Sequence, residues 1–550
     1  MTLSIKNTYK IIFFSFSGGG LRGIGKNVLI LQDILPEGRP MAAMIDFTPI
    51  SKPFMHGAYS EEKRAQERCA LSQQRLLEKL LKQGAKTAWG AAHGFERVNG
   101  AADFSRQPLT AYPDIRPWVE RMLAGESDVL WPGVCRRFAQ SSGTSDGKSK
   151  FVPITPQALN HGHYAGAAYS LASYLEHYPD SHVFGGKNFI LGGSFANEIP
   201  GLKRGVKVGD LSATLIDRIN PLVNLFRVPS KKVALMEDWT AKLPRLVEAS
   251  RKADIRSLSG VPSWFLTVIK EVVKVSGATT IHDVWPGLEV FFHGGIAFGP
   301  YREQYDRVTD PSKMRYWENY NASEGFFGVQ HLPGHPEMEL LMNTDTYYEL
   351  IPESEWSEPS PRAIPCWEAE PGKIYELVVT SSNGLWRYRL GDTVKVHSTT
   401  PLTITIAGRT RHFINAFGEE VMVYNTDAAL AEACRLTGTE ALNYTAAPVY
   451  AADGTRGRHQ WLIEFARPPR DVEKFADILD SELQRQNSDY QAKRSGGIFL
   501  NRAEVVLADA GLFDRWLAST GKLGGQRKVP RLSNDRSFID PMLAMQGLNH

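Results

Sequence analysis

Three things are scarce in this chain of 550 residues: cysteine, charge of one prevailing sign, and long apolar runs. The four cysteines lie far apart and form no C-x-x-C pair, so we expect reduced thiols and a cytoplasmic protein rather than a disulfide framework. Basic and acidic residues number 63 and 60, and a net charge of +3 argues against nucleic acid as a partner. Apolar runs stay well below the roughly 20 residues of a membrane-spanning helix, so no membrane association is expected.

The sequence pattern of residues 1–50 differs from that of the rest of the chain. A short apolar segment, residues 10–16, precedes Ser17-Gly-Gly-Gly-Leu-Arg-Gly23, and no clear periodicity follows. The segment is short and lacks a clean cleavage site, which argues against an export signal. The glycine run is similar to the oxyanion loop of patatin-like lipases, but such a lipase also needs a G-x-S-x-G elbow, and the chain has none. We therefore expect a flexible or atypical leader.

Beyond the leader, the patterns predict an α/β protein. Leucines at helical spacing indicate a helix over residues 64–83, and a shorter helix is expected over residues 118–123. Residues 170–280 combine apolar helical patterns with glycine and proline punctuation. From about residue 286 the segments become β-rich, and strands are expected at 288–293, 373–380, 394–397 and 403–407.

The last 130 residues or so indicate a smaller α+β unit. Strands are expected over residues 459–465 and 498–507. Asp471 is suited to cap a helix with Val472, Phe475, Leu479 and Leu483 facing inward. We expect an N-terminal domain over residues 51–415 and a mobile C-terminal domain over residues 416–550. The loop Gly408-Arg-Thr-Arg-His412 is the expected hinge.

The segment Ser141-Ser-Gly-Thr-Ser-Asp-Gly-Lys-Ser-Lys150, hereafter the serine-rich loop, is the most informative motif. Hydroxyls, glycines that let backbone N–H groups turn inward, and two lysines suit an oligophosphate. A Walker A loop needs four residues between its glycines, whereas three separate Gly143 from Gly147. The pattern therefore predicts a phosphate site that is not a Walker loop.

Four further segments gain meaning beside the serine-rich loop. In Tyr320-Asn-Ala-Ser-Glu324, an aromatic ring able to stack on a purine precedes a carboxylate able to hold Mg²⁺. In Trp386-Arg-Tyr-Arg-Leu-Gly-Asp392, a carboxylate after glycine suits capture of ribose hydroxyls. Gly408-Arg409 places a cation after a glycine, and Gly525-Gln-Arg-Lys-Val-Pro-Arg531 places Lys528 in a glycine-rich loop. Taken singly, each segment is also compatible with an ordinary turn or surface loop.

In this order, the five segments resemble the adenylate-forming superfamily, and within it the GH-three family of auxin-responsive acyl-acid amido synthetases. The serine-rich loop matches the family pattern S-S-G-T-[ST]-x-G-x-x-K, and Tyr320–Glu324, Tyr388–Asp392 and Gly525–Arg531 match its later motifs. The likeness begins near residue 53. It implies a large N-terminal domain of mixed sheets flanked by helices, and a smaller mobile C-terminal domain.

The resemblance also implies a role for each matching residue. Ser141, Ser142, Gly143, Thr144, Ser145 and Lys150 would bind the phosphates of ATP. Tyr320 would flank adenine beside Gly294 and Gly295, Ser323 would contact the α-phosphate region, and Asp392 would hold the ribose near Arg409. Glu324 would bind Mg²⁺, and Lys528 would approach the acyl-phosphate oxygens.

The resulting hypothesis is a ligase that uses ATP and Mg²⁺ to convert a carboxylic acid into its acyl-AMP and then joins the acyl group to an amino acid. Attack of a carboxylate on the α-phosphate brings two anions together, so fixed donors and cations would lower the barrier. An acyl- or aryl-CoA ligase with the same first step is the alternative, and a non-enzymatic nucleotide-binding protein is the third reading. The expected partners are small molecules; the sequence leaves the oligomeric state open and favours a monomer.

Overall fold

The structure of the chain is a computed structural model, which describes residues 46–550 apart from short gaps. These gaps are residues 142–149, 196–201, 296–297, 357, 359, 410–412, 415–418, 420, 451–456, 488–489, 492–493, 495–499, 521–528, 534 and 548–550. Most of the expected leader, residues 1–45, also lies outside the described residues. The expected boundary at residue 50 falls inside helix α1, which begins at Thr48.

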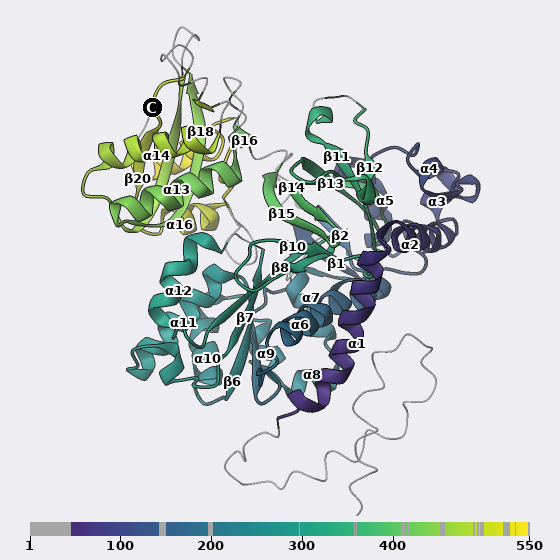
Figure 1. Cartoon of the computed structure of the whole chain (residues 1–550), viewed down its shortest axis with the longest axis horizontal. Coiled ribbons are helices and arrows are strands. Elements are labelled where there is room, and N and C mark those ends of the chain that lie inside the picture. The colour runs from purple at the N-terminus through teal and green to yellow at the C-terminus, as the bar shows by residue number, and fades with distance from the viewer. Residues whose placement is uncertain are drawn as a thin grey trace, which may run out of the picture. The chain divides into compact units, whose positions relative to one another are not determined.

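Helices alternate with short strands between Thr48 and Val308 (Figure 1). The helices of four residues or more are α1 Thr48–Glu67, α2 Cys69–Gly84, α3 Ala88–Ala92, α4 Gly100–Phe104, α5 Tyr112–Leu123, the π-helix η5 Ala158–Tyr164, α6 Ala165–His177, α7 Leu211–Arg218, α8 Pro221–Leu225, α9 Lys231–Ala234, α10 Trp239–Arg251, α11 Pro262–Ser276 and α12 Arg302–Val308. The expected helix over residues 64–83 is wrong as a single element, because α1 ends at Glu67 and Arg68 interrupts the helical path before α2.

Among the described residues, one sheet contains twelve strands in the order β12-β11-β13-β14-β15-β10-β9-β8-β7-β6-β3-β5. Their bounds are β3 Lys187–Ile190, β5 Arg227–Val228, β6 Ile255–Gly260, β7 Val290–Gly294, β8 Arg315–Ala322, β9 Gly325–Gln330, β10 Met338–Leu340, β11 Thr346–Pro352, β12 Ile364–Pro365, β13 Ile374–Ser381, β14 Leu385–Thr399 and β15 Leu402–Arg409. Strands β5, β3, β6, β7 and β8 run parallel, and the remaining pairs are antiparallel.

The parallel half of this sheet is covered by helices on both faces (Figure 1). Because successive side chains of a strand point to opposite faces, β7 contributes Phe291 to a core with α10, α11 and α12, and Val290 to a core with α6. Both side chains are fully buried. Phe265 of α11 belongs to the first core, so it is a packing residue, while Trp264 lies partly buried against the same core.

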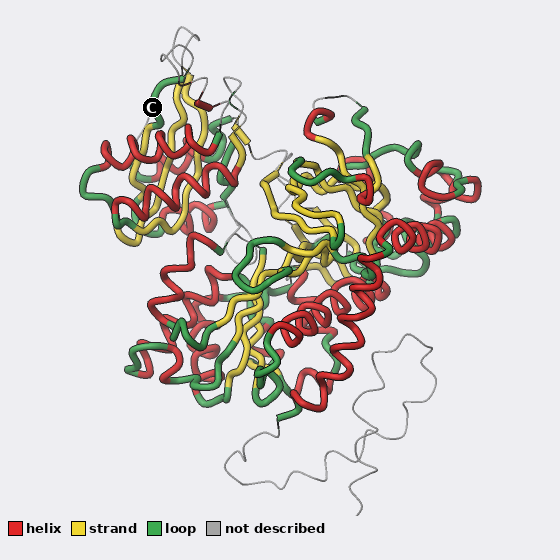
Figure 2. Tube along the Cα trace, in the orientation of Figure 1, coloured by secondary structure: helices red, strands yellow, loops and turns green. Residues whose placement is uncertain are grey.

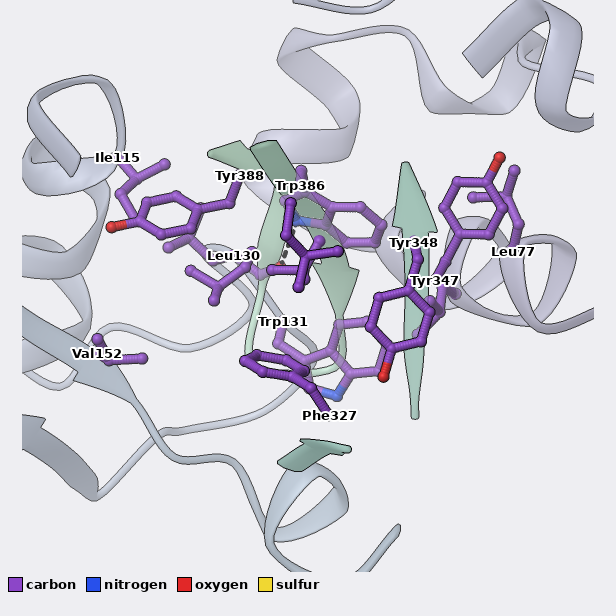
Figure 3. Packing of buried hydrophobic residues seen from close by; sticks show 14 of the residues in the cluster. Leu77, Ile115, Leu130, Trp131, Val152, Phe327, Tyr347, Tyr348, Trp386 and Tyr388 are labelled. Atoms are coloured by element: carbon purple, nitrogen blue, oxygen red, sulfur yellow. Dashed lines mark hydrogen bonds between the residues drawn. The ribbon is translucent and has the colours of Figure 1, made fainter. Parts of the chain in front are cut away.

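The antiparallel half packs around aromatic side chains that come from segments far apart in the sequence (Figure 3). The indole of Trp386 on β14 stacks on that of Trp131 at 5.9 Å, and its Nε1 donates a hydrogen bond to the carbonyl of Leu130 at 3.1 Å. The side chain of Trp386 also leaves no room for a Cβ at Gly84, where α2 ends. This core therefore ties the first helices to the strand that carries Asp392.

A small separate sheet contains the serine-rich loop. It has the order β2-β1-β4, with β1 Arg137–Ser141 antiparallel to β2 Lys150–Pro153 and parallel to β4 Lys207–Gly209. The side chain of Phe138 on β1 is fully buried, and the backbone N–H of Phe151 on β2 donates to the hydroxyl of Tyr112 at 2.8 Å. The two strands are thereby fixed against α5.

The C-terminal residues form their own layers of sheet and helix (Figure 2). The elements are β16 Phe413–Ile414, β17 Val421–Met422, α13 Val423–Thr437, β18 Glu440–Tyr450, β19 Gly457–Arg467, α14 Val472–Gln486, β20 Glu504–Ala508, α16 Leu512–Ser519 and α17 Ile539–Met545. The expected cap is confirmed, since Asp471 accepts a hydrogen bond from the N–H of Lys474. Of the residues expected to face inward, Phe475, Leu479 and Leu483 are fully buried and Val472 is partly buried. The expected strand over residues 498–507 is too early, because β20 begins at Glu504.

The expected fold class is confirmed by the large mixed sheet with its flanking helices and by the smaller C-terminal α+β layers. The division near residue 416 stays a prediction, although the core formed by β16 to β20 with α13 and α14 contains C-terminal residues alone. In the described part of the chain, no helix has both the length and the apolar character needed to cross a membrane.

Candidate active site

The serine-rich loop connects two antiparallel strands. Ser141 ends β1 and pairs with Lys150, which begins β2, while residues 142–149 lie outside the described residues. A Walker A loop instead leads from a strand into a helix, so the strand that follows Ser141 to Lys150 supports the exclusion made from the glycine spacing. The predicted phosphate contacts of Ser142, Gly143, Thr144 and Ser145 stay predictions.

Gly294 and Gly295 end the parallel strand β7 beside the strand that carries Tyr320. Gly294 pairs with Asn319, and a Cβ at Gly294 would lie 2.2 Å from the carbonyl oxygen of Asn319. Gly295 follows with a φ of +78°, which residues with a side chain rarely adopt. Both glycines are therefore required by the backbone at the carboxyl end of β7, the edge at which ligands of open α/β sheets bind.

Tyr320 and Asp392, from two of the predicted motifs, are in direct contact. The Tyr320 hydroxyl donates a hydrogen bond to Oδ2 of Asp392 at 2.6 Å. The exposed fractions of the two residues are 5% and 6%, and the Tyr320 ring packs edge-on against Phe327 at 5.1 Å. The structure thus brings the second and third motifs together, although 72 residues separate them in the chain.

Ser323 and Glu324 form a two-residue turn between β8 and β9. The flanking residues Ala322 and Gly325 pair with each other, and both turn residues are partly exposed. The carbonyl oxygen of Glu324 accepts a hydrogen bond from Nδ2 of Asn383 at 3.0 Å. The predicted metal-binding carboxylate therefore lies at the end of the same strand that carries Tyr320.

Asp392 and Arg409 are backbone neighbours on β14 and β15. Gly391, directly before Asp392, has a φ of +76°, and the pairing of β13 with β14 is irregular on this stretch, since Glu376 pairs with Thr393 and Val378 with Arg389. Such an irregularity turns a side chain away from the regular alternation. The positive φ of Gly391 explains the glycine before Asp392, and Asp392 and Arg409 pair across β14 and β15, while their roles at the ribose stay predictions.

Burial changes the protonation of two groups beside Tyr320. His293 on β7 pairs with Glu318 on β8, two residues before Tyr320. Burial lowers the pKa of His293 to about 3, with a smaller contribution from Arg302, and burial raises the pKa of Glu318 to about 7. Burial therefore disfavours the charged form of both groups.

The C-terminal motif is described only from Val529 onward, and Lys528 lies outside the described residues. The segment after the lysine lies alongside β18. The hydroxyl of Thr445 donates to the carbonyl of Pro530 at 2.7 Å, and the N–H of Ala446 donates to the carbonyl of Arg531 at 2.8 Å. Arg531 also forms an ion pair with Asp427. The role of Lys528 stays a prediction.

The carboxylates of the described residues do not gather in clusters of three or more that could bind a metal ion. No group of three or more His, Cys, Asp or Glu side chains suited to a metal ion occurs in the described ranges. His163 contacts Asn321 at 3.2 Å, and His331 contacts Glu339. A single carboxylate such as Glu324 fits Mg²⁺, which takes its other ligands from phosphates and water.

Sequence reasoning missed the loop that contacts Glu324. Asn383 lies between β13 and β14, shortly before the Trp386–Asp392 motif. No local pattern marks it, since its contact is with a residue 59 positions away. The direct Tyr320–Asp392 bond was missed for the same reason.

Comparison with protein families gives three consecutive matches along the chain. The GH3 family N-terminal domain matches residues 59–314, the central domain matches residues 339–409, and the C-terminal domain matches residues 424–537. Each candidate residue from Ser141 to Gly295 falls in the first match, Asp392 and Arg409 fall in the second, and Lys528 falls in the third.

Curated relatives are distant in sequence. The chain is 24% identical to jasmonoyl–L-amino acid synthetase GH3.5 of Oryza sativa subsp. japonica over 54% of this chain and 62% of that protein. It is 22% identical to the probable indole-3-acetic acid-amido synthetase GH3.2 of the same organism over 84% of this chain and 87% of that protein. Both relatives are named as ligases that form carbon–nitrogen bonds.

Solved structures share the fold. The AtGH3.15 acyl acid amido synthetase in complex with 2,4-DB superposes with a TM-score of 0.73 at 17% identity, over 93% of this chain and 97% of that one. A 2-hydroxyisobutyryl-CoA ligase in its postadenylation state gives a TM-score of 0.51 at 13% identity, over 94% of this chain and 96% of that one. With the three domain matches in chain order, this protein belongs to the GH3 family.

Proposed function

We propose that the chain is an ATP- and Mg²⁺-dependent acyl-acid amido synthetase, which converts a carboxylic acid into its acyl-AMP and transfers the acyl group to the amine of an amino acid. The observation that carries the proposal is the hydrogen bond between Tyr320 and Asp392. It joins the expected adenine and ribose residues at the carboxyl end of β7 and β8, where Gly294 and Gly295 let the backbone come close to a ligand. Membership of the GH3 family supports the same reading.

In the first half-reaction, an oxygen of the acid attacks the α-phosphorus of ATP and pyrophosphate leaves. The barrier is largely electrostatic because both reactants are anions. Asp392 binds the ribose hydroxyls, since a carboxylate has acceptor sites besides the one that Tyr320 uses. The serine-rich loop holds the β- and γ-phosphates, and Lys528 approaches the acyl-phosphate oxygens. Mg²⁺ bound to Glu324 would neutralise charge on the phosphates.

In the second half-reaction, the nitrogen of an amine attacks the carbonyl carbon of the acyl-AMP, AMP leaves, and the amine loses a proton. This step needs no nucleophilic side chain, which agrees with a site built from carboxylates, hydroxyls and backbone donors. The acyl-CoA ligase alternative differs only in the acceptor, and a likeness to a 2-hydroxyisobutyryl-CoA ligase extends to the fold alone. The amine acceptor, Mg²⁺ and a cytoplasmic location are parts of the proposal.

The test is exchange of labelled pyrophosphate into ATP, measured with aliphatic, aryl and indole acids. We expect exchange that depends on one class of acid and on Mg²⁺. Asp392→Ala should abolish it, whereas Asp310→Ala, which removes an exposed carboxylate bonded to Ser312, should retain it. Absence of pyrophosphate exchange by the folded wild-type protein with every acid would contradict the proposal.

An acceptor assay then separates the two ligase readings. Amino acids and coenzyme A are offered in parallel with an acid that supports exchange, and the products are weighed by mass spectrometry. An acyl-amino acid is expected, and a thioester as the main product would replace the amide-forming reading with the CoA-ligase reading.

A further inference from the structure

The loop between β13 and β14, made of Ser382, Asn383 and Gly384, lies among the segments that carry the candidate site. We call it the β13–β14 loop. Its ends are closed by the pairing of Ser381 with Leu385 and by a hydrogen bond from the N–H of Gly384 to the carbonyl of Ser381 at 3.0 Å. The strand that follows it carries Asp392. The loop therefore fixes the start of β14, the strand that carries the expected ribose-binding residue.

Two other contacts hold the β13–β14 loop from the side of the serine-rich loop. The hydroxyl of Thr155, two residues after β2, donates to the carbonyl of Ser382 at 2.8 Å, and Thr155 is itself 2% exposed. Gly384 has a φ of +81°, and a Cβ there would lie 2.6 Å from the Cβ of Leu130. The loop is thus fixed against the hairpin that bears the expected phosphate donors.

Asn383 extends this fixed point to the metal-binding turn. Its Nδ2 donates to the carbonyl of Glu324 at 3.0 Å, and its exposed fraction is 1%. A carbonyl is an acceptor only, so the amide nitrogen must face it and the amide orientation is determined. The backbone of Glu324 is consequently tied to the same loop that Thr155 holds.

Three side-chain oxygens of residues 381–383 are buried. Within the described residues, the buried Oγ of Ser381, Oγ of Ser382 and Oδ1 of Asn383 have no hydrogen-bond partner. A buried polar atom without a partner costs roughly 1–3 kcal/mol, so such atoms usually bind water or a ligand. Oδ1 of Asn383, on the side chain that contacts the Glu324 carbonyl, is therefore an acceptor that a bound water or ligand can use.

We propose that Asn383 is a positioning residue, which holds the Glu324 turn against the β13–β14 loop and so sets the affinity for Mg²⁺. The inference rests on the proposed function, because it concerns the same metal and nucleotide. Asn383 acts through the backbone of Glu324 and does not itself need to touch the ion. Supporting residues of this kind typically change metal affinity by roughly 10–100-fold when they are replaced.

The experiment measures pyrophosphate exchange while Mg²⁺ is titrated at a fixed, saturating ATP concentration. Chelation of Mg²⁺ by ATP is the same for every variant, so a shift in the half-saturating Mg²⁺ concentration reports on the protein. We expect Asn383→Ala and Asn383→Leu to raise this concentration about tenfold or more. The KM for the carboxylic acid should change little, and Asn383→Leu, which removes the donor at similar size without burying a charge, should keep the melting temperature close to that of the wild type.

Asn425→Ala is the matched control. Asn425 is also fully buried, and its side chain accepts from the N–H of Met422 and donates to the carbonyl of Gln486, both at 3.0 Å, in the C-terminal layers. Its loss should lower the melting temperature and leave the half-saturating Mg²⁺ concentration unchanged.

Two outcomes would overturn the inference. One is wild-type Mg²⁺ dependence in both Asn383 variants. The other is failure of Asn383→Leu to fold, which would make Asn383 a structural residue. A wild-type protein without any exchange would instead refute the proposed function, so the two failures are distinguishable.

Discussion

The hydrogen bond between Tyr320 and Asp392 connects strands that are not neighbours in the sheet. Three strands, β9, β10 and β15, lie between β8 and β14 in the strand order. A 2.6 Å contact across this span requires the sheet to curl so that the two strands approach each other. Because the acceptor is a buried carboxylate, the contact also fixes the orientation of the group that we expect to bind ribose.

Tyr320→Phe tests this arrangement. A hydrogen bond to a charged group contributes roughly 1.5–3 kcal/mol, and its loss removes one of the contacts that orient the Asp392 carboxylate. We expect the KM for ATP in pyrophosphate exchange to rise about tenfold, with a smaller change in the KM for the acid.

The matched control for this variant is Tyr490→Phe. The Tyr490 hydroxyl is likewise buried and donates to Oδ1 of Asp480 at 2.7 Å, in the C-terminal layers. Both variants should lose similar stability. An unchanged KM for ATP in Tyr320→Phe, with a lowered melting temperature in both variants, would show that the Tyr320–Asp392 bond is only structural.

Single residues of one motif can have different purposes. Arg387 lies in the Trp386–Asp392 motif, but its guanidinium binds the carboxylate of Glu349, and the exposed fractions of the two side chains are 4% and 2%. Its φ of +45° follows from the irregular pairing of β13 and β14. Thus Asp392 was predictable from its chemistry, whereas the structural role of Arg387 depends on a partner 38 residues away and could not be predicted.

At the scale of elements, amphipathic patterns predicted a helix correctly, whereas short buried strands were not predicted. The helix capped by Asp471 was predicted correctly because cap and apolar stripe agree. The parallel strands β3 and β6 were missed within residues 170–280, since a short apolar run between helices fits either a strand or a buried helix. These strands are nevertheless the centre of the parallel half of the sheet.

Helix α1 is held on the large sheet by a buried carboxyl group. Glu62 accepts hydrogen bonds from the N–H groups of Met342 at 2.6 Å and Asn343 at 2.9 Å, and from Nε2 of Gln66 at 2.9 Å. The pKa of Glu62 is raised to about 7, mainly by burial and to a smaller extent by the nearby Glu339, while the three hydrogen bonds oppose this rise. The folded protein therefore binds a proton at Glu62 more tightly than the unfolded chain does.

This difference predicts a pH dependence of stability. Because the pKa is raised on folding, the stabilising contribution is fully present below the unfolded pKa near 4.5 and is lost as the pH rises through about 7. The shift corresponds to roughly 3 kcal/mol in the free energy of unfolding. We expect urea unfolding at acidic and at mildly alkaline pH to show this loss in the wild type and not in Glu62→Gln.

Glu61→Gln, an exposed neighbour on the same helix, is the control and should retain the wild-type pH dependence. An equal pH dependence in wild type and Glu62→Gln would mean that Glu62 has an ordinary pKa in the folded protein.

At the scale of the whole molecule, the order of the motifs was the decisive signal, and the three GH3 domain matches confirm the family. Composition and charge narrowed the class of protein without indicating a reaction. The contacts among Tyr320, Asp392, Glu324 and Asn383 required the folded sheet, since they join β8, β14 and two turns. The phosphate contacts of residues 142–149 and the approach of Lys528 stay predictions.

The most direct test of acyl-AMP formation follows the oxygen atoms of the acid. An acid labelled with ¹⁸O in its carboxylate is incubated with ATP, Mg²⁺ and an amino acid, and the nucleotide products are analysed by mass spectrometry. If the carboxylate attacks the α-phosphorus, one ¹⁸O atom passes to AMP when the amine displaces it, and pyrophosphate stays unlabelled. Label in orthophosphate together with formation of ADP would show attack at the γ-phosphorus and would contradict the adenylation that we propose.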